Sequence, residues 1–306
     1  MTRPARKPDS RDSDPAPRAS LRERAENAVL MAAIALALRL PLARRVAFMG
    51  WLAQHLLAPL SGARGRVRAN LAHVMPELPE AEIARICRGV TNNIGRTMIE
   101  IFSGDDFVQA SARMPVEGPG LAALESARAT GRPVILVTAH LGNYEAGRSA
   151  LSARGYPIGA LYMPMANAAF NRHYVAAMAR FGEPLFPLGR EGLAGMLRHL
   201  RDGGMLGLLI DHHTEHGETL DFLGKPARTA LSAAEMALRH KALLIPGYSI
   251  RQPDGTSFRI VLEEPVPHGD PVTMTQALND SIAARVRAHP EQWFWVHRRW
   301  KNTEPG

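Results

Sequence analysis

From Pro133 onward, short apolar runs with the character of buried strands alternate with longer segments of helical periodicity. Residues 134–137 form an uninterrupted apolar run rich in β-branched side chains, and a Gly-Arg-Pro turn precedes them. Similar runs recur at 157–161, 184–187, 205–210, 243–250 and 258–263, and helical patterns at 167–180, 191–201, 230–241 and 273–288 separate or follow them. This alternation predicts an α/β fold with a mixed, largely parallel sheet flanked by helices.

The rest of the chain adds helices before this sheet. Two helices are expected at 79–88 and 91–102, and the sheet is expected to begin at Pro133. With 306 residues, of which 46% are hydrophobic, the chain can form a complete α/β core, and we predict one domain over residues 63–306. The single cysteine, Cys87, excludes an internal disulfide and is expected to be a small buried apolar side chain.

The N-terminal region has the composition of a membrane-associated segment. Residues 1–20 are rich in Arg, Asp, Pro and Ser, which predicts a disordered basic tail. Residues 28–38 are continuously apolar, but they are shorter than the roughly twenty residues that a spanning helix needs, and an amphipathic helix is expected at 46–60. We therefore predict a membrane-associated helical anchor over residues 21–62, with core helices of a soluble protein as the alternative.

The charge distribution bears on the partners. A formal net charge of +8 favours an acidic partner, which can be nucleic acid, an anionic membrane or an acidic protein. Residues 27–76 contain no Asp or Glu, whereas six arginines lie there among apolar residues. This mixture is typical of a membrane surface.

A histidine and a carboxylate lie close together directly after the strand at 134–137. His140 should lie at the carboxyl end of this strand, which is the edge where open α/β sheets bind ligands. If Asn143 caps a helix over about 144–153, Glu145 lies in its first turn and can fold back toward the imidazole. A carboxylate that accepts a hydrogen bond from one ring nitrogen makes the other ring nitrogen a better general base. The alternative is that both residues only cap the loop and the helix.

A second carboxylate, Asp211, follows the strand at 205–210. If the two strands are neighbours, Asp211 can reach the His140 crevice, where it either binds substrate or competes with Glu145 for the imidazole. A metal site built from Asp211 and the three nearby histidines is the rival interpretation. Consecutive side chains of an extended chain point apart, however, and no helical His-Glu-x-x-His pattern is present, so we predict no metal.

The C-terminal segment 293–301 mixes aromatic rings with fixed cations. Arg298 and Arg299 can bind phosphate or carboxylate, and tryptophan favours the membrane interface, so an anionic lipid headgroup suits both. Nucleic acid could bind the same segment by stacking. Packing of the rings on the core, with the cations in water, is the third possibility. No glycine-rich phosphate loop is found, and no cofactor is predicted.

Several motifs occur in an order that resembles one family. They are His140-Leu-Gly-Asn-Tyr-Glu145, Tyr162-Met-Pro-Met-Ala-Asn167, Asp211 after its strand, Phe222-Leu-Gly-Lys-Pro-Ala-Arg-Thr229 and Trp295-Val-His-Arg-Arg-Trp-Lys301, with residues 66–71, Met75-Pro76 and Glu100 before them. This set spans most of the chain and resembles the late acyltransferases of lipid A biosynthesis, the lauroyl/myristoyl transferase family. The relatives that acylate phosphatidylinositol mannosides share much of the pattern. Tyr144 stands where the family often has Trp, and His212-His213 stand where glutamine is usual.

The resemblance implies a reaction. A fatty acyl chain is transferred from the thioester of acyl carrier protein to a hydroxyl of a lipid A precursor, at the cytoplasmic face of the inner membrane. His140 is the implied general base and Glu145 the group that stabilises its imidazolium, without metal, cofactor or covalent intermediate. The candidate substrate-binding residues are Asn143, Asn167, Arg180, Asp211, Arg298 and Arg299.

The partners implied are acyl carrier protein, a lipid A precursor and anionic membrane lipid, and not nucleic acid. Another glycolipid or lysophospholipid acceptor remains an alternative, as does a membrane-surface lipid-binding protein without turnover. A lipid hydrolase is disfavoured, because the Gly-x-Ser-x-Gly nucleophile elbow is absent from the sequence.

Overall fold

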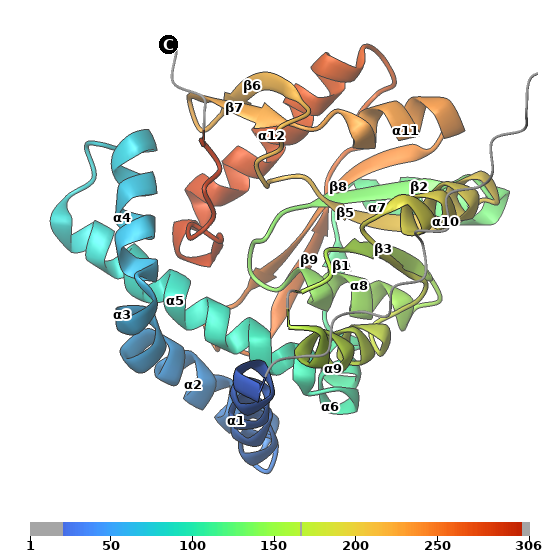
Figure 1. Ribbon diagram of the computed structural model, residues 1–306. Helices are drawn as coiled ribbons and strands as arrows, with labels where there is room; N and C mark the ends of the chain where they lie inside the picture. The colour runs from blue at the N-terminus through green and yellow to red at the C-terminus, as the bar shows by residue number, and fades with distance from the viewer. Residues whose placement is uncertain (1–20, 166, 302–306) are drawn as a thin grey trace, which may run out of the picture.

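One seven-stranded sheet organises the molecule. The computed structural model describes residues 21–165 and 167–301, so the tail expected at 1–20 lies outside the described residues (Figure 1). The strands are β1 (Val116–Glu117), β2 (Val134–Thr138), β3 (Ile158–Tyr162), β4 (Leu185–Pro187), β5 (Met205–Leu209), β8 (Leu243–Arg251) and β9 (Phe258–Leu262), in the spatial order β1-β9-β8-β2-β5-β3-β4. Neighbouring strands are parallel except β8 and β9. The predicted α/β class with a mixed, largely parallel sheet is confirmed.

Helices cover both faces of the sheet, as the apolar runs require. Ile135 and Val137 of β2 belong to a large core with helices α10 (Arg190–Arg201), α11 (Ser232–His240) and α12 (Pro271–Ala288). Val134 and Leu136 point to the other face and pack in a core with α7 (Gly120–Thr130) and α8 (Tyr144–Ser152). A strand that is buried on both faces needs apolar residues at every position, which is why β2 shows no polar alternation.

Helix α5 (Glu80–Phe102) crosses one side of the sheet as a single helix of 23 residues. The prediction of two helices, with a break near Gly89, was therefore wrong. A Cβ atom at Gly89 would lie 2.4 Å from Glu291, and one at Gly95 would lie 2.3 Å from the carbonyl oxygen of Met49. These glycines allow neighbouring segments to approach the helix closely and do not end it.

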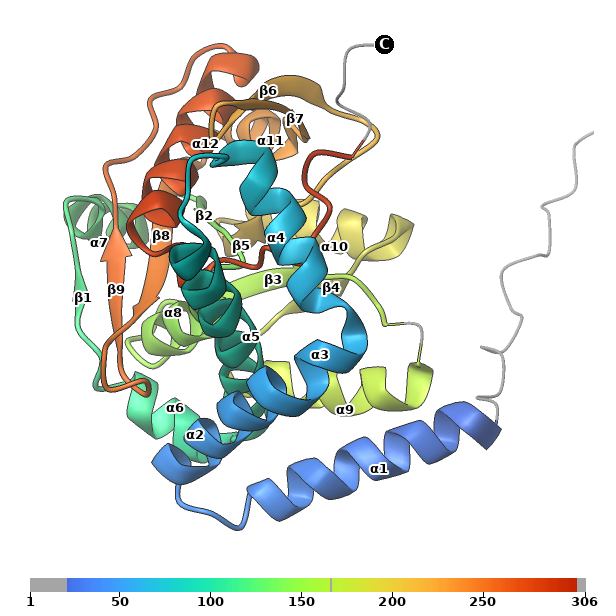
Figure 2. The ribbon, with the colours of Figure 1, turned by 90° about the vertical axis from the view of Figure 1, so that its left-hand side faces the viewer.

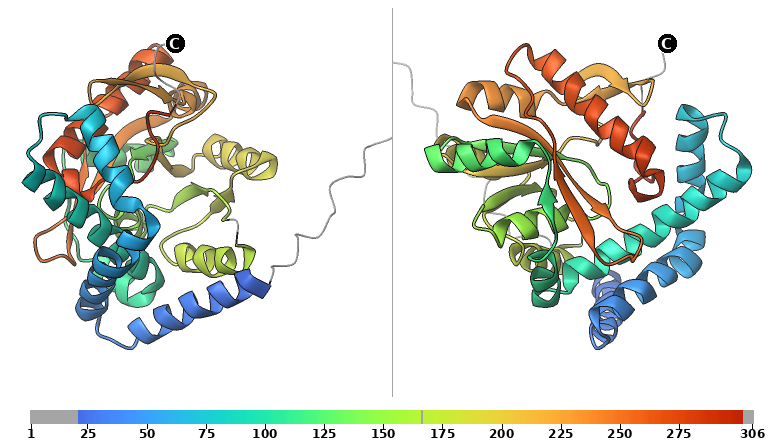
Figure 3. Two further views of the ribbon diagram at one scale, coloured as in Figure 1. Left: turned by 60° about the vertical axis from the view of Figure 1, so that its left-hand side comes forward. Right: turned by 180° about the vertical axis from the view of Figure 1, so that it is seen from behind.

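The N-terminal helices gather beside α5 (Figure 2), on the side of the molecule opposite α10 (Figure 3). They are α1 (Leu21–Ala37), α2 (Leu42–Leu52), a π-helical turn (Ala53–Leu57), α3 (Ala58–Ser61) and α4 (Ala63–Val74). Among the described residues, no helix is both long enough and apolar enough to cross a membrane. Several large apolar side chains are exposed on these helices, including Leu36, Trp51 and Leu60, the last at 86%.

Three further elements complete the site's surroundings. Helices α6 (Asp105–Ser111) and α9 (Ala168–Ala179) pack around α8, and β6 (Glu218–Phe222) pairs with β7 (Lys225–Thr229) in an antiparallel hairpin outside the main sheet. Strand β1 and this hairpin were not predicted, and the sheet does not begin at Pro133. A two-residue strand is too short for a sequence pattern, and β1 exists only through its pairing with β9.

Candidate active site

The neighbouring strands β2 and β5 bring the first histidine and the second carboxylate together. The two strands are parallel, with Thr138 opposite Leu209, so the residues that follow them meet at one sheet edge. The Nδ1 atom of His140 lies 2.9 Å from Oδ1 of Asp211, and the His140 backbone N–H donates to Oδ2 at 2.8 Å. The structure thus pairs His140 with Asp211.

Asp211 is held as a buried acceptor. Its side chain is 1% exposed, and its Oδ2 also accepts a hydrogen bond from Nε1 of Trp293 at 2.9 Å. Burial by itself raises the pKa of Asp211, but the charge of His140 and the hydrogen bonds from it outweigh burial, so this pKa lies below its ordinary value. An ionised carboxylate only accepts hydrogen bonds, which places the imidazole proton on Nδ1 and leaves Nε2 of His140 as the basic nitrogen.

The expected contact between Glu145 and His140 was wrong. Glu145 is 2% exposed, and its Oε2 accepts a hydrogen bond from Nε of Arg148 at 2.7 Å. The guanidinium of Arg148 also donates to the carbonyl oxygens of Met178 and Gly182, at 2.8 and 2.6 Å. Glu145 does lie in the first turn of α8, as expected, but on a face that turns toward the end of α9.

Asn143 caps α8, as the sequence predicted. Its Oδ1 accepts from the Glu145 N–H at 3.0 Å. Its Nδ2 donates to Oε2 of Glu100 at 2.9 Å, and the side chain is 0% exposed. The Asn143 amide is thus buried with both of its polar atoms bonded within the protein, and its expected role in substrate binding stays a prediction.

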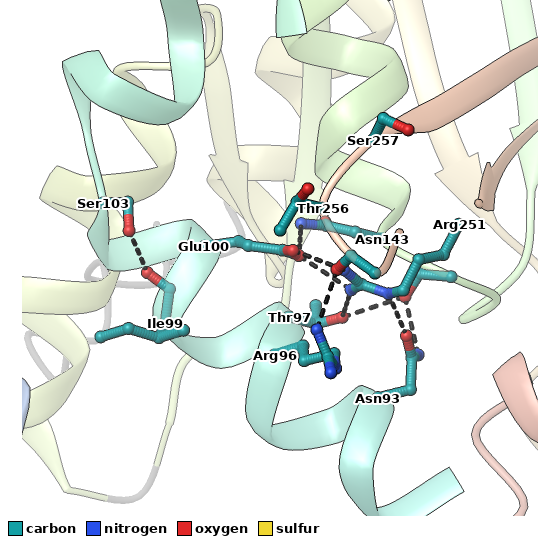
Figure 4. Close-up of polar contacts among 12 residues, drawn as sticks. Asn93, Arg96, Thr97, Ile99, Glu100, Ser103, Asn143, Arg251, Thr256 and Ser257 are labelled. Atoms are coloured by element: carbon teal, nitrogen blue, oxygen red, sulfur yellow. Dashed lines mark hydrogen bonds and ion pairs between the residues drawn. The ribbon is translucent and has the colours of Figure 1, made fainter. Parts of the chain in front are cut away.

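A buried ion pair stands behind this cap (Figure 4). The Arg251 guanidinium donates to both oxygens of Glu100, at 2.5 and 2.9 Å, and its Nε donates to Oδ1 of Asn93 at 2.7 Å. Asn93 and Thr97 in turn donate to the carbonyl oxygen of Gly142, at 2.9 and 3.0 Å. Helix α5 and the end of β8 therefore fix the loop that carries His140.

Gly142 makes the sharp turn of this loop. Its φ is +60°, and a Cβ atom would lie 2.1 Å from the carbonyl oxygen of Ser249. The C-terminal segment closes the other side, because Leu141 forms a β-bridge with Trp293 and the N–H of Phe294 donates to the His140 carbonyl at 2.9 Å.

His140 lines an apolar cavity of about 290 Å³. Helix α5 contributes one wall with Val90, Ile94 and Met98, and Tyr174 of α9 and Phe294 contribute others. The His140 side chain is 23% exposed, whereas the side chain of its partner Asp211 is 1% exposed. A reacting group can meet His140 here with an attached hydrocarbon chain in apolar surroundings.

The remaining candidate residues lie in different environments. Arg299 is 0% exposed and donates to the Arg228 carbonyl and to Oγ1 of Thr229, so its guanidinium is used inside the protein, and its expected contact with a headgroup stays a prediction. Burial lowers the pKa of this guanidinium to about 10. Arg298, by contrast, is exposed.

Asn167 and Arg180 are at opposite ends of α9. Asn167 caps the helix by accepting from the Phe170 N–H at 3.0 Å. Arg180 follows the helix and forms an exposed ion pair with Asp105 at 2.9 Å. Neither residue lines the cavity that contains His140.

Sequence reasoning missed the role of Trp293 and of the Glu100–Arg251 pair. Trp293 was visible only as part of an aromatic segment, and Arg251 carries no local signal, because its partners are distant in the sequence. Within residues 21–165 and 167–301, no group of three or more His, Cys, Asp or Glu side chains is placed to hold a metal ion.

Fold and site together define an α/β protein with a buried carboxylate paired to a histidine that lines an apolar cavity. The chain belongs to the bacterial lipid A biosynthesis acyltransferase family, whose model matches residues 20–302. It is an acyltransferase of this family.

Similar curated proteins carry more than one acceptor in their names. The phosphatidylinositol mannoside acyltransferase of Mycobacterium tuberculosis (strain CDC 1551 / Oshkosh) is 24% identical over 78% of this chain and 78% of its own. The lipid A biosynthesis lauroyltransferase of Escherichia coli (strain K12) is 24% identical over 78% and 79%, respectively. The myristoyltransferase of the same strain is 25% identical over 80% and 77%.

Proposed function

We propose that this protein transfers a fatty acyl group from an acyl carrier protein thioester to a hydroxyl of a lipid A precursor, with His140 as general base. The observation that carries the proposal is the pairing of Asp211 with His140, which lines an apolar cavity, in a chain of the lipid A acyltransferase family. Asp211 replaces Glu145 in the role that the sequence suggested for the latter.

The chemistry needs only groups that the site contains. Nε2 of His140 removes the proton of the acceptor hydroxyl as its oxygen attacks the thioester carbonyl. The new C–O bond forms, the C–S bond breaks, and the imidazolium returns the proton to the departing thiolate. Asp211 accepts the Nδ1–H throughout, which keeps the ring oriented and stabilises its positive charge. Glu145, paired with Arg148, holds α8 against α9 and does not take part in this transfer.

The two substrates follow from charge and shape. Acyl carrier protein is strongly acidic, and the net charge of +8 favours its approach. The cavity beside His140 accommodates an acyl chain, and the exposed Arg298, which directly follows His297 in the sequence, is our candidate for contact with a phosphate of the acceptor. We retain Asn167 and Arg180 as weaker candidates on the same acceptor.

Residues 21–62 are proposed to lie on the cytoplasmic face of the inner membrane. Exposed apolar side chains on α1 to α3, with Trp51 and Leu60 among them, accompany the exposed Arg39 and Arg44. A helix that presents apolar and cationic side chains together binds an anionic lipid surface without crossing it. This places the 63–306 domain next to its lipid acceptor.

The test is mass spectrometry of lipids after incubation with acyl-acyl carrier protein and a tetra-acylated lipid A precursor in detergent. Wild-type protein should add the mass of one acyl chain, and His140→Ala should not. His173→Ala, which removes an exposed histidine of α9, is the matched control and should act as wild type. Release of the carrier's thiol is followed in parallel.

The outcomes separate the alternatives. If wild type acylates a phosphatidylinositol mannoside or a lysophospholipid and not the lipid A precursor, the chemistry stands and the acceptor is wrong. If no acceptor gains mass and no thiol is released, the proposed reaction is refuted and a lipid-binding role takes its place.

A further inference from the structure

Three imidazole rings form a continuous stack at the site. The ring of His212 lies 4.1 Å from that of His140 with an angle of 6° between the planes, and 3.9 Å from that of His297 with an angle of 15°. The three residues come from separate segments: the loop after β2, the loop after β5 and the C-terminal segment. His212 is the central ring.

The nitrogens of His212 do not explain its position. Its Nε2 is buried and has no hydrogen-bond partner among the described residues. A buried polar atom without a partner costs free energy, and its retention calls for another role of the side chain. The outer ring is better anchored, because the His213 backbone N–H donates to Nε2 of His297 at 3.0 Å. The contacts of the His212 ring with His140 and His297 are made through its two flat faces.

The central ring is also uncharged. Burial, followed by repulsion from His140 when that ring is protonated, lowers the pKa of His212 to about 3, and burial lowers the pKa of His297 as well. The other titratable groups that act on His212 are Asp211, which favours its protonated form, and His297 and Arg299, which oppose it. At neutral pH, His140 thus contacts the π face of a neutral ring, which attracts a cation.

We propose that His212 is a positioning residue, whose ring is clamped by His297 and holds the plane of His140 while its neutral face stabilises the imidazolium that forms there. The inference rests on the proposed role of His140 as the base. Asp211 fixes one nitrogen of the imidazole, and the rings of Tyr144 and Phe294 approach it at 5.3 and 5.9 Å, whereas only His212 lies flat against a face of the ring among these three. The stack opposes tilting of the ring about the Asp211 hydrogen bond, so Nε2 of His140 stays directed at the acceptor hydroxyl.

Two substitutions separate the face of the ring from its nitrogens. His212→Phe keeps a flat aromatic face and removes both nitrogens, whereas His212→Leu keeps apolar bulk and removes the face. We expect kcat to fall about tenfold in His212→Leu, which corresponds to about 1.4 kcal/mol, with KM for the acyl donor within about twofold of wild type. His212→Phe should retain kcat within about threefold. Thermal unfolding of each variant confirms that only folded protein is compared.

A second measurement does not depend on substrate. The Nδ1 proton of His140, which donates to Asp211, should give a slowly exchanging downfield proton resonance in wild type and His212→Phe, and a broadened one in His212→Leu. If wild type acylates no acceptor, the proposed function fails, and this resonance alone decides whether the stack immobilises the ring.

Two results overturn the proposal. One is a His212→Leu protein that keeps wild-type kcat or, where no acylation is seen, the wild-type resonance. The other is a His212→Phe protein whose kcat falls as far as that of His212→Leu, because the effect on kcat would then come from the nitrogens of His212 and not from its face.

Discussion

Removal of the Arg251 guanidinium should destabilise the protein strongly. Glu100 is 1% exposed and accepts hydrogen bonds from Arg251 at both oxygens, so Arg251→Met leaves its carboxylate buried, with the Asn143 amide as its one remaining hydrogen-bond donor among the described residues. Breaking a buried ion pair from one side costs about 3–5 kcal/mol, against a total stability of about 5–15 kcal/mol for a typical protein. Urea unfolding followed by circular dichroism measures the difference directly.

Two further variants make this prediction sharp. Arg251→Met combined with Glu100→Met removes the stranded charge and should recover part of the loss, since no buried carboxylate remains. Arg259→Met breaks an exposed pair with Glu117, 3.4 Å long, and should cost at most about 1 kcal/mol. The reasoning is refuted if Arg251→Met lowers the free energy of unfolding no more than Arg259→Met does. It is also refuted if the double variant is less stable than Arg251→Met alone by a further amount of about 3–5 kcal/mol.

Three other outcomes follow from the site. Asp211→Asn should lower kcat by about 10²- to 10⁴-fold in a thiol-release assay, because this variant loses the negative charge that orients His140. Glu145→Gln should keep kcat within about tenfold of wild type, because Glu145 pairs with Arg148. Equal losses of kcat in the two variants would contradict the assignment of Asp211 as the partner of His140. Gly142→Ala should cost more than about 1 kcal/mol in urea unfolding, since the left-handed φ of +60° and the contact with Ser249 both oppose a Cβ atom. Stability should fall as pH drops from the ordinary His pKa of 6.5 toward about 3, because the unfolded chain takes up a proton that folded His212 does not accept. In urea titrations, His212→Phe should show a slope shallower by up to about 1.4 kcal/mol per pH unit over this window, and an unchanged slope would contradict the burial of a neutral His212.

The sequence was sufficient for the fold class because its signal is local. Uninterrupted apolar runs such as residues 134–137 are typical of a strand that is buried on both faces. Helices between such strands serve as crossover connections, which join parallel strands of one sheet. The same local logic located Asn143 as a helix cap, because capping depends on residues a few positions apart. It failed at Gly89, where a glycine that serves close packing resembles one that ends a helix.

The sequence by itself determined that this chain forms an α/β sheet, that His140 lies at its carboxyl edge, and that the chain resembles lipid A acyltransferases. Only the tertiary structure decided which carboxylate contacts the His140 imidazole. Glu145 is five positions away and Asp211 is 71, yet the pairing of β2 with β5 brings Asp211 to 2.9 Å, while the turn of α8 directs Glu145 to Arg148. Contacts of this kind depend on the order of the strands and on the direction in which a helix face points. Both are determined by interactions between residues that are distant in the sequence.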